Sequence, residues 1–281
     1  MDGAKDAGAR RLFFELAPLS GRVTIDPCGV NFFNSLPRNI TPYLNWFADS
    51  GLDPDAWRNI GKKIQQRTPL KAGKTGNDRL PPLSDPFLFV PLQTPGDSQL
   101  RLFGGNFRTV EAFINCMIVC AKHLPQNWHL RIKEHPTAPV SFADQLKGLG
   151  NTQVFLDNRT DTFEQVAASR GVITVNSSVG LEAMFYDRPV IATGQCFWAI
   201  EGVAHKAVTQ DDIIQLFAAA DTLGYDRASR TAFMSYLTHE YYPLAPGNSH
   251  EGGISASIAK RICGPDSIGF WGCQESKETA R

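Results

Sequence analysis

The chain has 281 residues, 28 basic and 28 acidic side chains, and an apolar content of 42%. This length allows one large domain or two small ones, and the composition is that of an ordinary globular protein. Zero net charge disfavours a general nucleic-acid-binding protein, because such proteins need a clustered basic surface to displace counterions. No apolar run approaches the roughly 18 to 20 residues of a membrane-spanning helix. Residues 1–11 lack the apolar core of an export signal.

Residues 1–84 are predicted to form a short N-terminal α/β region that ends in a linker. Residues 11–16 and 22–26 are typical of strands, and residues 40–51 have the pattern of a helix that ends at Gly51. Residues 68–86 are rich in proline, glycine and lysine, as linkers are.

From residue 85 to residue 224, short apolar runs alternate with amphipathic stretches. Thr162 with Gln165, and Thr209 with Asp212, have the spacing of capping boxes at helix starts. The order of elements predicts a parallel sheet with helices on both faces, in which ligands bind beyond the carboxyl ends of the strands. The predicted strands are 86–92, 129–134, 152–157, 172–176 and 189–194, and the predicted helices are 106–124, 141–149, 162–171, 177–187 and 213–223.

The six cysteines are scattered and include no Cys-x-x-Cys pair and no neighbouring histidines at zinc spacing. Because free cysteine is often buried, we interpret Cys116 and Cys120, four residues apart, as helix packing rather than as a redox or metal site. The cysteine usage predicts a reducing compartment. His123 and His129 are interpreted as turn or core residues rather than as metal ligands.

A charged segment, Lys133-Glu134-His135-Pro136, follows the second predicted strand of the sheet. A lysine and a histidine at a strand end suit a phosphate, because the ammonium attracts it and the imidazole donates a proton to a leaving oxygen. The alternative is a surface histidine in a turn, and a two-residue His-Pro match is by itself a weak signal.

Small polar residues, Asn176-Ser177-Ser178, follow the fourth predicted strand and begin the next helix. Serine side chains at this point cap the helix, and they also direct its free N–H groups toward an anion. Capping alone is the commoner case. Glu182, one turn further, either reaches a ribose hydroxyl or faces solvent. The segment matches neither a GxGxxG loop nor a P-loop, which disfavours a dinucleotide-binding or P-loop protein.

Gln93, Asp97 and Gln99 follow the first predicted strand in the stretch QTPGDSQ. Their side chains are hydrogen-bond partners for hydroxyl groups, which is typical of sugar binding. Asp97 also lies in a Pro-Gly turn, where aspartate is a common turn former, so both interpretations stay open.

Three polar clusters at strand ends are stronger evidence for a binding site than any one cluster alone, because the carboxyl ends of parallel strands meet at one edge of the sheet. Together they predict a cleft with phosphate-directed groups and a carboxylate nearby. This arrangement is typical of a glycosyltransferase that uses a nucleotide sugar.

Several segments resemble the capsular polysaccharide biosynthesis proteins, the β-Kdo transferases of the capsule lipid linker. The resemblance covers residues 11–262. It is carried by IKEHP (132–136), TVNSSVGLEAMFYDRPVIATGQCFW (174–198) with GVAH (202–205), GRVTIDPCGVNFFNSLPRN (21–39) and PLQTPGDSQL (91–100).

The resemblance implies an α/β fold of GT-B type. Its Rossmann-like nucleotide-sugar-binding domain would span residues 85–262, followed by a loose tail at 263–281. Residues 1–84 would form the acceptor-side region, which is too short here for a complete second Rossmann domain.

The same resemblance implies CMP-Kdo as donor, a lipid-linked saccharide as acceptor, and retaining transfer that needs no metal ion or other cofactor. His135 then binds the CMP phosphate and assists its departure, and Ser177 and Ser178 hold the phosphate or the cytidine end. Asp97 acts on the anomeric carbon of Kdo as nucleophile or base. The other candidates for substrate binding are Gln93, Gln99, Lys133, Glu134, Asn176 and Glu182.

Two other functions stay open: a transferase that uses another CMP or UDP sugar, and a catalytically silent nucleotide-binding scaffold subunit of a capsule export or assembly complex. The short N-terminal region favours the scaffold, whereas Asp97, His135 and the two serines disfavour it. The family implies a cytoplasmic protein with peripheral association at the inner membrane. The aromatic residues Trp46, Phe47 and Trp57 are interpreted as core contacts rather than as bilayer contacts.

Overall fold

A computed structural model describes residues 11–61, 79–147, 153–245, 258 and 262. Its contacts divide the chain into two compact units, one of Gln65–Arg230 and one of Met1–Ile64 with Thr231–Arg281. The division at Arg230 differs from the predicted boundary at residue 262, because the chain after Arg230 packs with the N-terminal segment. The predicted tail and most of the predicted linker lie outside the described residues.

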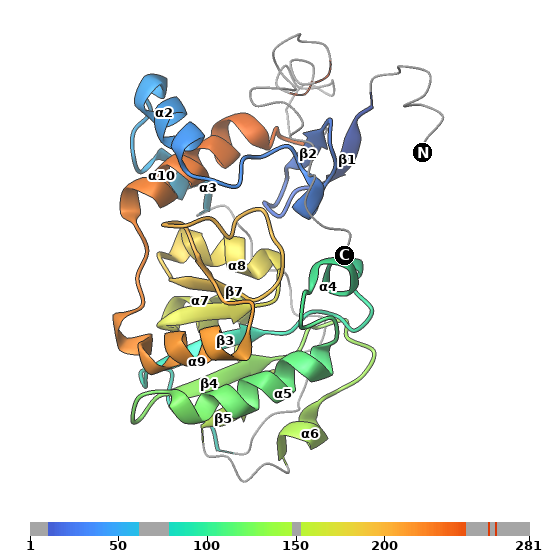
Figure 1. Cartoon of the computed structure of the whole chain (residues 1–281), viewed down its shortest axis with the longest axis vertical. Coiled ribbons are helices and arrows are strands. Elements are labelled where there is room, and N and C mark those ends of the chain that lie inside the picture. Colours follow the sequence, from blue (N-terminus) through green and yellow to red (C-terminus); the bar gives the residue numbers. More distant parts are fainter. Residues whose placement is uncertain (1–10, 62–78, 148–152, 246–257, 259–261, 263–281) are drawn as a thin grey trace. The chain divides into compact units, whose positions relative to one another are not determined.

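The unit of Gln65–Arg230 is built on a six-stranded sheet (Figure 1). Its strand order is β5-β4-β3-β6-β7-β8, and every neighbouring pair is parallel. The five predicted strands are all present, and β8 is an additional short strand at one edge. The strands are β3 (Phe87–Pro91), β4 (His129–Lys133), β5 (Val154–Leu156), β6 (Gly171–Thr174), β7 (Val190–Ala192) and β8 (His205–Lys206).

Helices cover both faces of this sheet, as the alternation of strands and helices predicts (Figure 1). On one face α5 packs against α9, and on the other α7 and α8 pack together against β3, β6 and β7. The structure adds α4, which was not predicted. The helices are α4 (Ser98–Phe103), α5 (Val110–Cys120), α6 (Ala143–Lys147), α7 (Thr162–Ala168), α8 (Ser178–Ala183) and α9 (Gln210–Ala218), with the 3-10 turns η2 (Ala121–His123), η3 (Met184–Tyr186) and η4 (Ala220–Thr222) after α5, α8 and α9.

Helix starts follow the side chains that cap them. Thr209 and Asp212 form the predicted capping box of α9. The predicted capping box at Thr162 was wrong, because Asp161 caps α7 with its carboxylate. The helix predicted at 106–124 begins at Val110, because the Thr109 hydroxyl accepts a hydrogen bond from the first turn.

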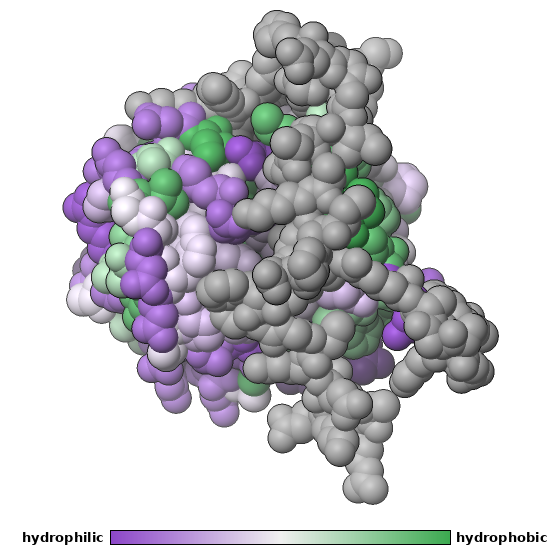
Figure 2. All heavy atoms as spheres, turned by 90° about the horizontal axis from the view of Figure 1, so that it is seen from above, coloured by the Kyte–Doolittle hydropathy of each residue, from purple (hydrophilic) through white to green (hydrophobic). Residues whose placement is uncertain are grey.

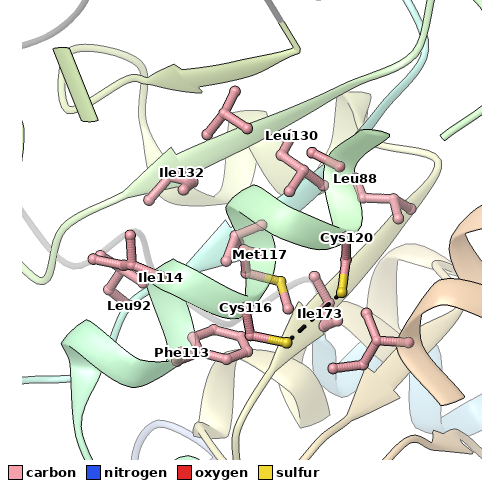
Figure 3. Packing of buried hydrophobic residues seen from close by; sticks show 14 of the residues in the cluster. Leu88, Leu92, Phe113, Ile114, Cys116, Met117, Cys120, Leu130, Ile132 and Ile173 are labelled. Carbon is pink, nitrogen blue, oxygen red and sulfur yellow. Dashed lines mark hydrogen bonds between the residues drawn. The ribbon is translucent and has the colours of Figure 1, made fainter. Parts of the chain in front are cut away.

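The core between α5, α9 and the sheet is continuous and apolar, and it contains the cysteine pair (Figure 3). The Sγ atoms of Cys116 and Cys120 lie 3.7 Å apart in a hydrogen bond. This hydrogen bond lowers the pKa of Cys116 and raises that of Cys120. Both thiols are buried among leucine, isoleucine and phenylalanine side chains, so the packing interpretation is confirmed.

The described cysteines do not all carry free thiols. Cys116, Cys120 and Cys196 carry thiols, whereas Cys28 is disulfide-bonded. A disulfide at Cys28 is not expected in the reducing compartment that the cysteine usage predicts.

The second unit combines a two-stranded antiparallel ribbon with helices from both ends of the chain. The buried carboxylate of Asp26, at the end of the ribbon, accepts hydrogen bonds from the backbone of Cys28 and Gly29, from Ser35 and from the hydroxyl of Tyr241. These bonds join the N-terminal loop to the C-terminal segment. The elements are β1 (Phe13–Leu16), β2 (Val23–Asp26), η1 (Asn31–Phe33), α2 (Thr41–Ser50), α3 (Ala56–Gly61), the later part of α10 (Arg227–Tyr236) and the π-helical turn η5 (Leu237–Tyr241).

Two of the three aromatic residues considered as bilayer contacts, Trp46 and Trp57, pack within this second unit. Trp57 is fully buried, and the ring of Trp46 meets that of Tyr236 edge-on at a centroid distance of 5.1 Å. Hydrophilic and hydrophobic side chains are interspersed over the described surface on the face drawn in Figure 2. None of the helices in the described part of the chain has the length and apolar character needed to span a membrane.

Candidate functional site

The sheet of Gln65–Arg230 has a topological switch point between β3 and β6. From β3 the chain adds β4 and β5 on one side, and it then returns to add β6, β7 and β8 on the other. Ligands of parallel α/β sheets bind beyond the carboxyl ends of the strands at such a point. Gln93 follows β3 and Asn176 follows β6, so both stand at this position.

Gln93 and Asn176 are hydrogen-bonded to each other. Gln93 Nε2 donates to Asn176 Oδ1 at 2.9 Å, and the backbone N–H of Asn176 donates to Gln93 Oε1 at 3.3 Å. Gln93 Nε2 also lies 3.4 Å from Asp97 Oδ2. Gln93 is 8% exposed and borders a small, mostly apolar pocket beneath it. The structure therefore brings two of the three predicted polar clusters together, those that follow β3 and β6.

The side chain of Asn176 also holds two loops. Its Nδ2 donates to the carbonyl of Gln99 at 2.9 Å and to the carbonyl of Gln195 at 3.4 Å. Gln99 therefore joins the cluster through its backbone. Gln195, which follows β7, was not singled out in the sequence, because it takes part through its backbone.

Asp97 caps α4 and belongs to the cluster at the same time. Its Oδ1 accepts a hydrogen bond from the N–H of Gln99 at 2.7 Å, while its Oδ2 is the oxygen near Gln93. The turn-forming interpretation is confirmed by this cap. The half-buried carboxylate keeps its second oxygen toward the strand ends, so the cap does not exclude a chemical role.

Ser177 caps α8, with its Oγ accepting from the N–H of Val179 at 3.3 Å. Ser177 and Ser178 are both half-buried. Glu182 is 2% exposed, so the solvent-facing alternative for it was wrong. Gly180 lies against Trp198, and a Cβ on that glycine would meet the indole ring at 2.6 Å.

Lys133 is directed toward the loop that follows β5. Its Nζ donates to the carbonyls of Asn158 and Thr160 at 3.2 and 2.7 Å. Burial lowers the pKa of Lys133, and the nearby carboxylates of Asp157 and Asp161 oppose that shift. The backbone N–H of Leu92 donates to the Lys133 carbonyl at 2.8 Å, which places this segment beside the loop of Gln93.

Glu134, which follows β4, holds the segment at Ser141 and Phe142 together with the loop that follows β5. Its carboxylate accepts from the hydroxyl of Ser141, from the N–H of Phe142 and from Asn158 Nδ2. Asn158 Oδ1 in turn accepts from the N–H of Glu134 at 2.9 Å. Asn158 was not predicted from the sequence, where its one signal is its position two residues after the strand β5.

The imidazole of His135 is oriented by Thr137. The backbone N–H of Thr137 donates to His135 Nδ1 at 3.3 Å, and the Thr137 hydroxyl lies 2.9 Å from the same nitrogen. A backbone N–H can only donate, so Nδ1 is an acceptor and the neutral ring carries its proton on Nε2. This tautomer is assigned from the hydrogen bonds. An Nε2–H group suits donation to a phosphate oxygen.

The comparison with protein families identifies the chain. A model described as capsule polysaccharide biosynthesis protein matches residues 56–239, more than half of the sequence. The chain belongs to this family. The resemblance predicted from the sequence motifs is thus confirmed.

Two curated relatives, FixF and LipB, are longer than this chain. Protein FixF of Sinorhizobium fredii is 29% identical over 259 residues, which cover 91% of this chain and 59% of FixF. Capsule polysaccharide modification protein LipB of Neisseria meningitidis serogroup A is 27% identical over 152 residues, which cover 51% of this chain and 34% of LipB. This chain therefore spans less than two thirds of FixF and about a third of LipB.

A solved structure shares the fold. KpsC of Thermosulfurimonas dismutans, a beta Kdo 2,7 transferase, matches with a TM-score of 0.52 at 15% sequence identity. The match covers 91% of this chain and 80% of the KpsC chain. The predicted α/β, GT-B-like fold class is confirmed by this likeness and by the parallel sheet.

Proposed function

We propose that this capsule-family protein is a retaining glycosyltransferase that transfers Kdo from CMP-Kdo to a lipid-linked saccharide. The proposal is carried by the positions of Asp97, His135 and Ser177, which follow the carboxyl ends of β3, β4 and β6, three strands that are neighbours in the sheet. A solved structure of the same fold is a Kdo transferase, which supports this choice of sugar.

In this proposal, His135 acts on the leaving group. Its Nε2–H donates to a phosphate oxygen of CMP and offsets the charge that develops as the bond to Kdo breaks. Ser177 and Ser178 contribute hydroxyl hydrogen bonds to the same phosphate or to the cytidine end. Lys133 adds positive charge at the strand end. These groups supply the charge stabilisation in a transfer that we propose to be independent of a metal ion.

Asp97 acts on the sugar. Two successive displacements at the anomeric carbon give retention, and in this route a carboxylate oxygen supplies the first nucleophile. Asp97 Oδ2 forms a bond to the anomeric carbon as the bond from that carbon to the CMP phosphate breaks. The acceptor hydroxyl then displaces the carboxylate and gives its proton to the phosphate of the departed CMP. Gln99 is proposed to bind sugar hydroxyls. Because Glu182 is buried, it is left out of this set.

The acceptor places the proposed reaction at a membrane surface. A lipid-linked saccharide stays with its bilayer, so we propose a peripheral association with the cytoplasmic face of the inner membrane. Co-sedimentation of the protein with vesicles that contain the acceptor lipid tests this association, and vesicles without it are the control.

Calorimetric titration tests the donor. We expect wild-type protein to bind CMP in preference to UMP and UDP, and His135→Ala to lose most of that affinity. His123→Ala is the matched control, because His123 is an exposed histidine outside the strand ends. Turnover of CMP-Kdo with a Kdo-bearing lipid then tests the transfer. Preference for UMP or UDP would mean a different donor. Binding of CMP without turnover would favour the nucleotide-binding scaffold subunit, and no binding at all would overturn the proposed function.

A further inference from the structure

Two carboxamide side chains in the proposed site bind the protein's own loops. Both hydrogens of Gln93 Nε2 have acceptors, Asn176 Oδ1 and Asp97 Oδ2. Both hydrogens of Asn176 Nδ2 have acceptors as well, the carbonyls of Gln99 and Gln195. Neither amide group keeps a hydrogen for a ligand in this arrangement.

We propose that Gln93 and Asn176 are positioning residues rather than substrate-binding residues. They join three loops, residues 93–99, 176–178 and 193–196, into one unit that we call the switch-point frame. The frame presents Asp97 to the donor sugar. The identity of that sugar rests on the proposed function, whereas the frame itself does not.

The frame holds the Asp97 carboxylate at both oxygens. The N–H of Gln99 binds Oδ1 and the Gln93 amide binds Oδ2, so the plane of the carboxylate is set by two donors. Nucleophilic attack depends strongly on such orientation, because small misplacements raise the barrier. Loss of the Gln93 amide therefore releases the oxygen that faces the strand ends.

Burial makes these hydrogen bonds costly to break. Gln93 is 8% exposed and has apolar neighbours, including Leu100 and Val175, around the pocket beneath it. A polar group left unpaired in such surroundings loses its hydrogen bond without a full replacement by water. The arrangement shown is thus strongly preferred over one in which the amide turns to a ligand.

The third loop is also held by its backbone. The N–H of Gln195 donates to the carbonyl of Phe103, at the end of α4, at 2.7 Å. A Cβ on Gly194 would lie 2.7 Å from Val175 and 2.8 Å from the Phe103 carbonyl, so the loop approaches α4 closely. Helix α4 is therefore attached to the frame at both of its ends.

Amide hydrogen exchange and kinetics test the inference in Gln93→Met, which keeps the size of the side chain and removes its hydrogen bonds. The N–H groups of Asn176 and Gln99 should exchange about tenfold faster or more, as expected for loss of a buried hydrogen bond. The value of kcat should fall at least about tenfold through misplacement of Asp97, with the Kd for CMP changed by less than about threefold.

A second variant and a matched control separate positioning from stability. Asn176→Asp keeps Oδ1 but places a carboxylate oxygen against the carbonyls of Gln99 and Gln195, and it should give the same pattern. Gln145→Met removes another carboxamide hydrogen bond, from Gln145 Nε2 to Asn115 Oδ1 at 2.8 Å, away from the strand ends. This control should leave both exchange rates and kcat unchanged.

The outcomes are distinguishable. Wild-type exchange rates at Asn176 and Gln99 in both variants would overturn the inference whatever the activity. A loss of CMP affinity equal to the loss of transfer would also overturn it, because the amides would then be binding residues. If wild-type protein neither binds CMP nor transfers Kdo, the proposed function fails, and the exchange rates alone decide whether the frame exists.

Discussion

The carboxamide of Gln93 forms two hydrogen bonds with Asn176, 83 residues further along the chain. Its Nε2 donates to Asn176 Oδ1 at 2.9 Å, and its Oε1 accepts from the Asn176 backbone N–H at 3.3 Å. They join the ends of β3 and β6, the two strands on either side of the switch point. Asn176 also binds the carbonyls of Gln99 and Gln195. The pair therefore fixes the loops that follow β3, β6 and β7 relative to one another.

The dual role of Asp97 determines which substitution is informative. Asp97→Asn keeps an oxygen for the cap of α4, because asparagine is as good an N-cap as aspartate, but it removes the nucleophilic charge. We expect transfer to be abolished while CMP affinity and thermal stability stay near those of the wild type. Asp97→Ala should in addition lose about 1 kcal/mol of stability with the cap.

Asp226→Asn is the matched control for Asp97→Asn. Asp226 Oδ2 accepts from the N–H of Ser229 at 2.7 Å, a cap of the same kind outside the strand ends. Transfer by this variant should equal that of the wild type. Loss of CMP binding in Asp97→Asn would contradict the role assigned to the carboxylate.

Glu134 should matter through the loop that it holds. In Glu134→Gln a single oxygen remains for the three donors from Ser141, Phe142 and Asn158, so at least one of them loses its acceptor. Thermal unfolding should show a loss of about 1–2 kcal/mol. CMP affinity should fall less than in His135→Ala.

Glu164→Gln is the control for this substitution, because Glu164 is exposed on α7. Its unfolding temperature should be unchanged. If Glu134→Gln is as stable as the wild type but loses CMP binding entirely, Glu134 contacts the nucleotide directly.

His129 predicts a pH dependence of stability. Burial, with help from the Arg131 charge and against the effect of Asp85, lowers the pKa of His129 to about 4. The unfolded chain takes up this proton near the ordinary pKa of about 6.5, whereas the folded chain does not. The contribution of neutral His129 to the free energy of unfolding is therefore complete above about pH 6.5. It is lost as the pH falls toward 4, by at most about 3 kcal/mol.

Denaturant unfolding between pH 4 and 7 measures this contribution. The ring of His129 stacks on Phe87 and meets Phe155 edge-on, so phenylalanine suits the position in His129→Phe. That variant should show a flatter stability profile over the same range. The exposed control His123→Gln should keep the wild-type slope, and an equal slope in all three proteins would exclude His129 as its source.

Gly180 is needed for close packing. A Cβ at this position would lie 2.6 Å from the Trp198 indole and 3.2 Å from Thr174, and the indole is buried. Gly180→Ala should therefore destabilise the protein by about 1–3 kcal/mol through overpacking. Gly224→Ala, where the nearest atom is 4.0 Å away, should be close to neutral in the same unfolding experiment. Equal stability of the two variants would mean that Trp198 moves freely.

Much of the fold follows from local signals in the sequence. The uninterrupted apolar run of β3, Phe87–Pro91, predicts a strand buried on both faces, and all five of its residues are buried. Gly51, in the left-handed conformation at φ 64°, ends α2 where the sequence predicts it. Signals of this kind depend on residues a few positions apart, so they can be read without knowing the strand order.

The candidate site followed from the sequence only in part. Gln93, His135 and Asn176 were placed after β3, β4 and β6 from the sequence, because parallel strands bring their carboxyl ends to one edge. Thr137, which orients His135, was not.

In the sequence, the charges and positions of Lys133 and Glu134 are those expected of ligand-binding residues. In the structure, both side chains instead form hydrogen bonds with Asn158. Asn158 lies 24 residues after Glu134 in the chain, so patterns of neighbouring residues do not predict this contact.

The sequence by itself determined the family, the alternation of strands and helices, and the residues that stand at the strand ends. Only the tertiary structure decided which of these residues face one another. Gln93 meets Asn176 because β6 lies beside β3, and this strand order depends on the packing of whole layers. Local propensity is set by neighbours along the chain, whereas hydrogen bonds between strand ends require the sheet to have formed.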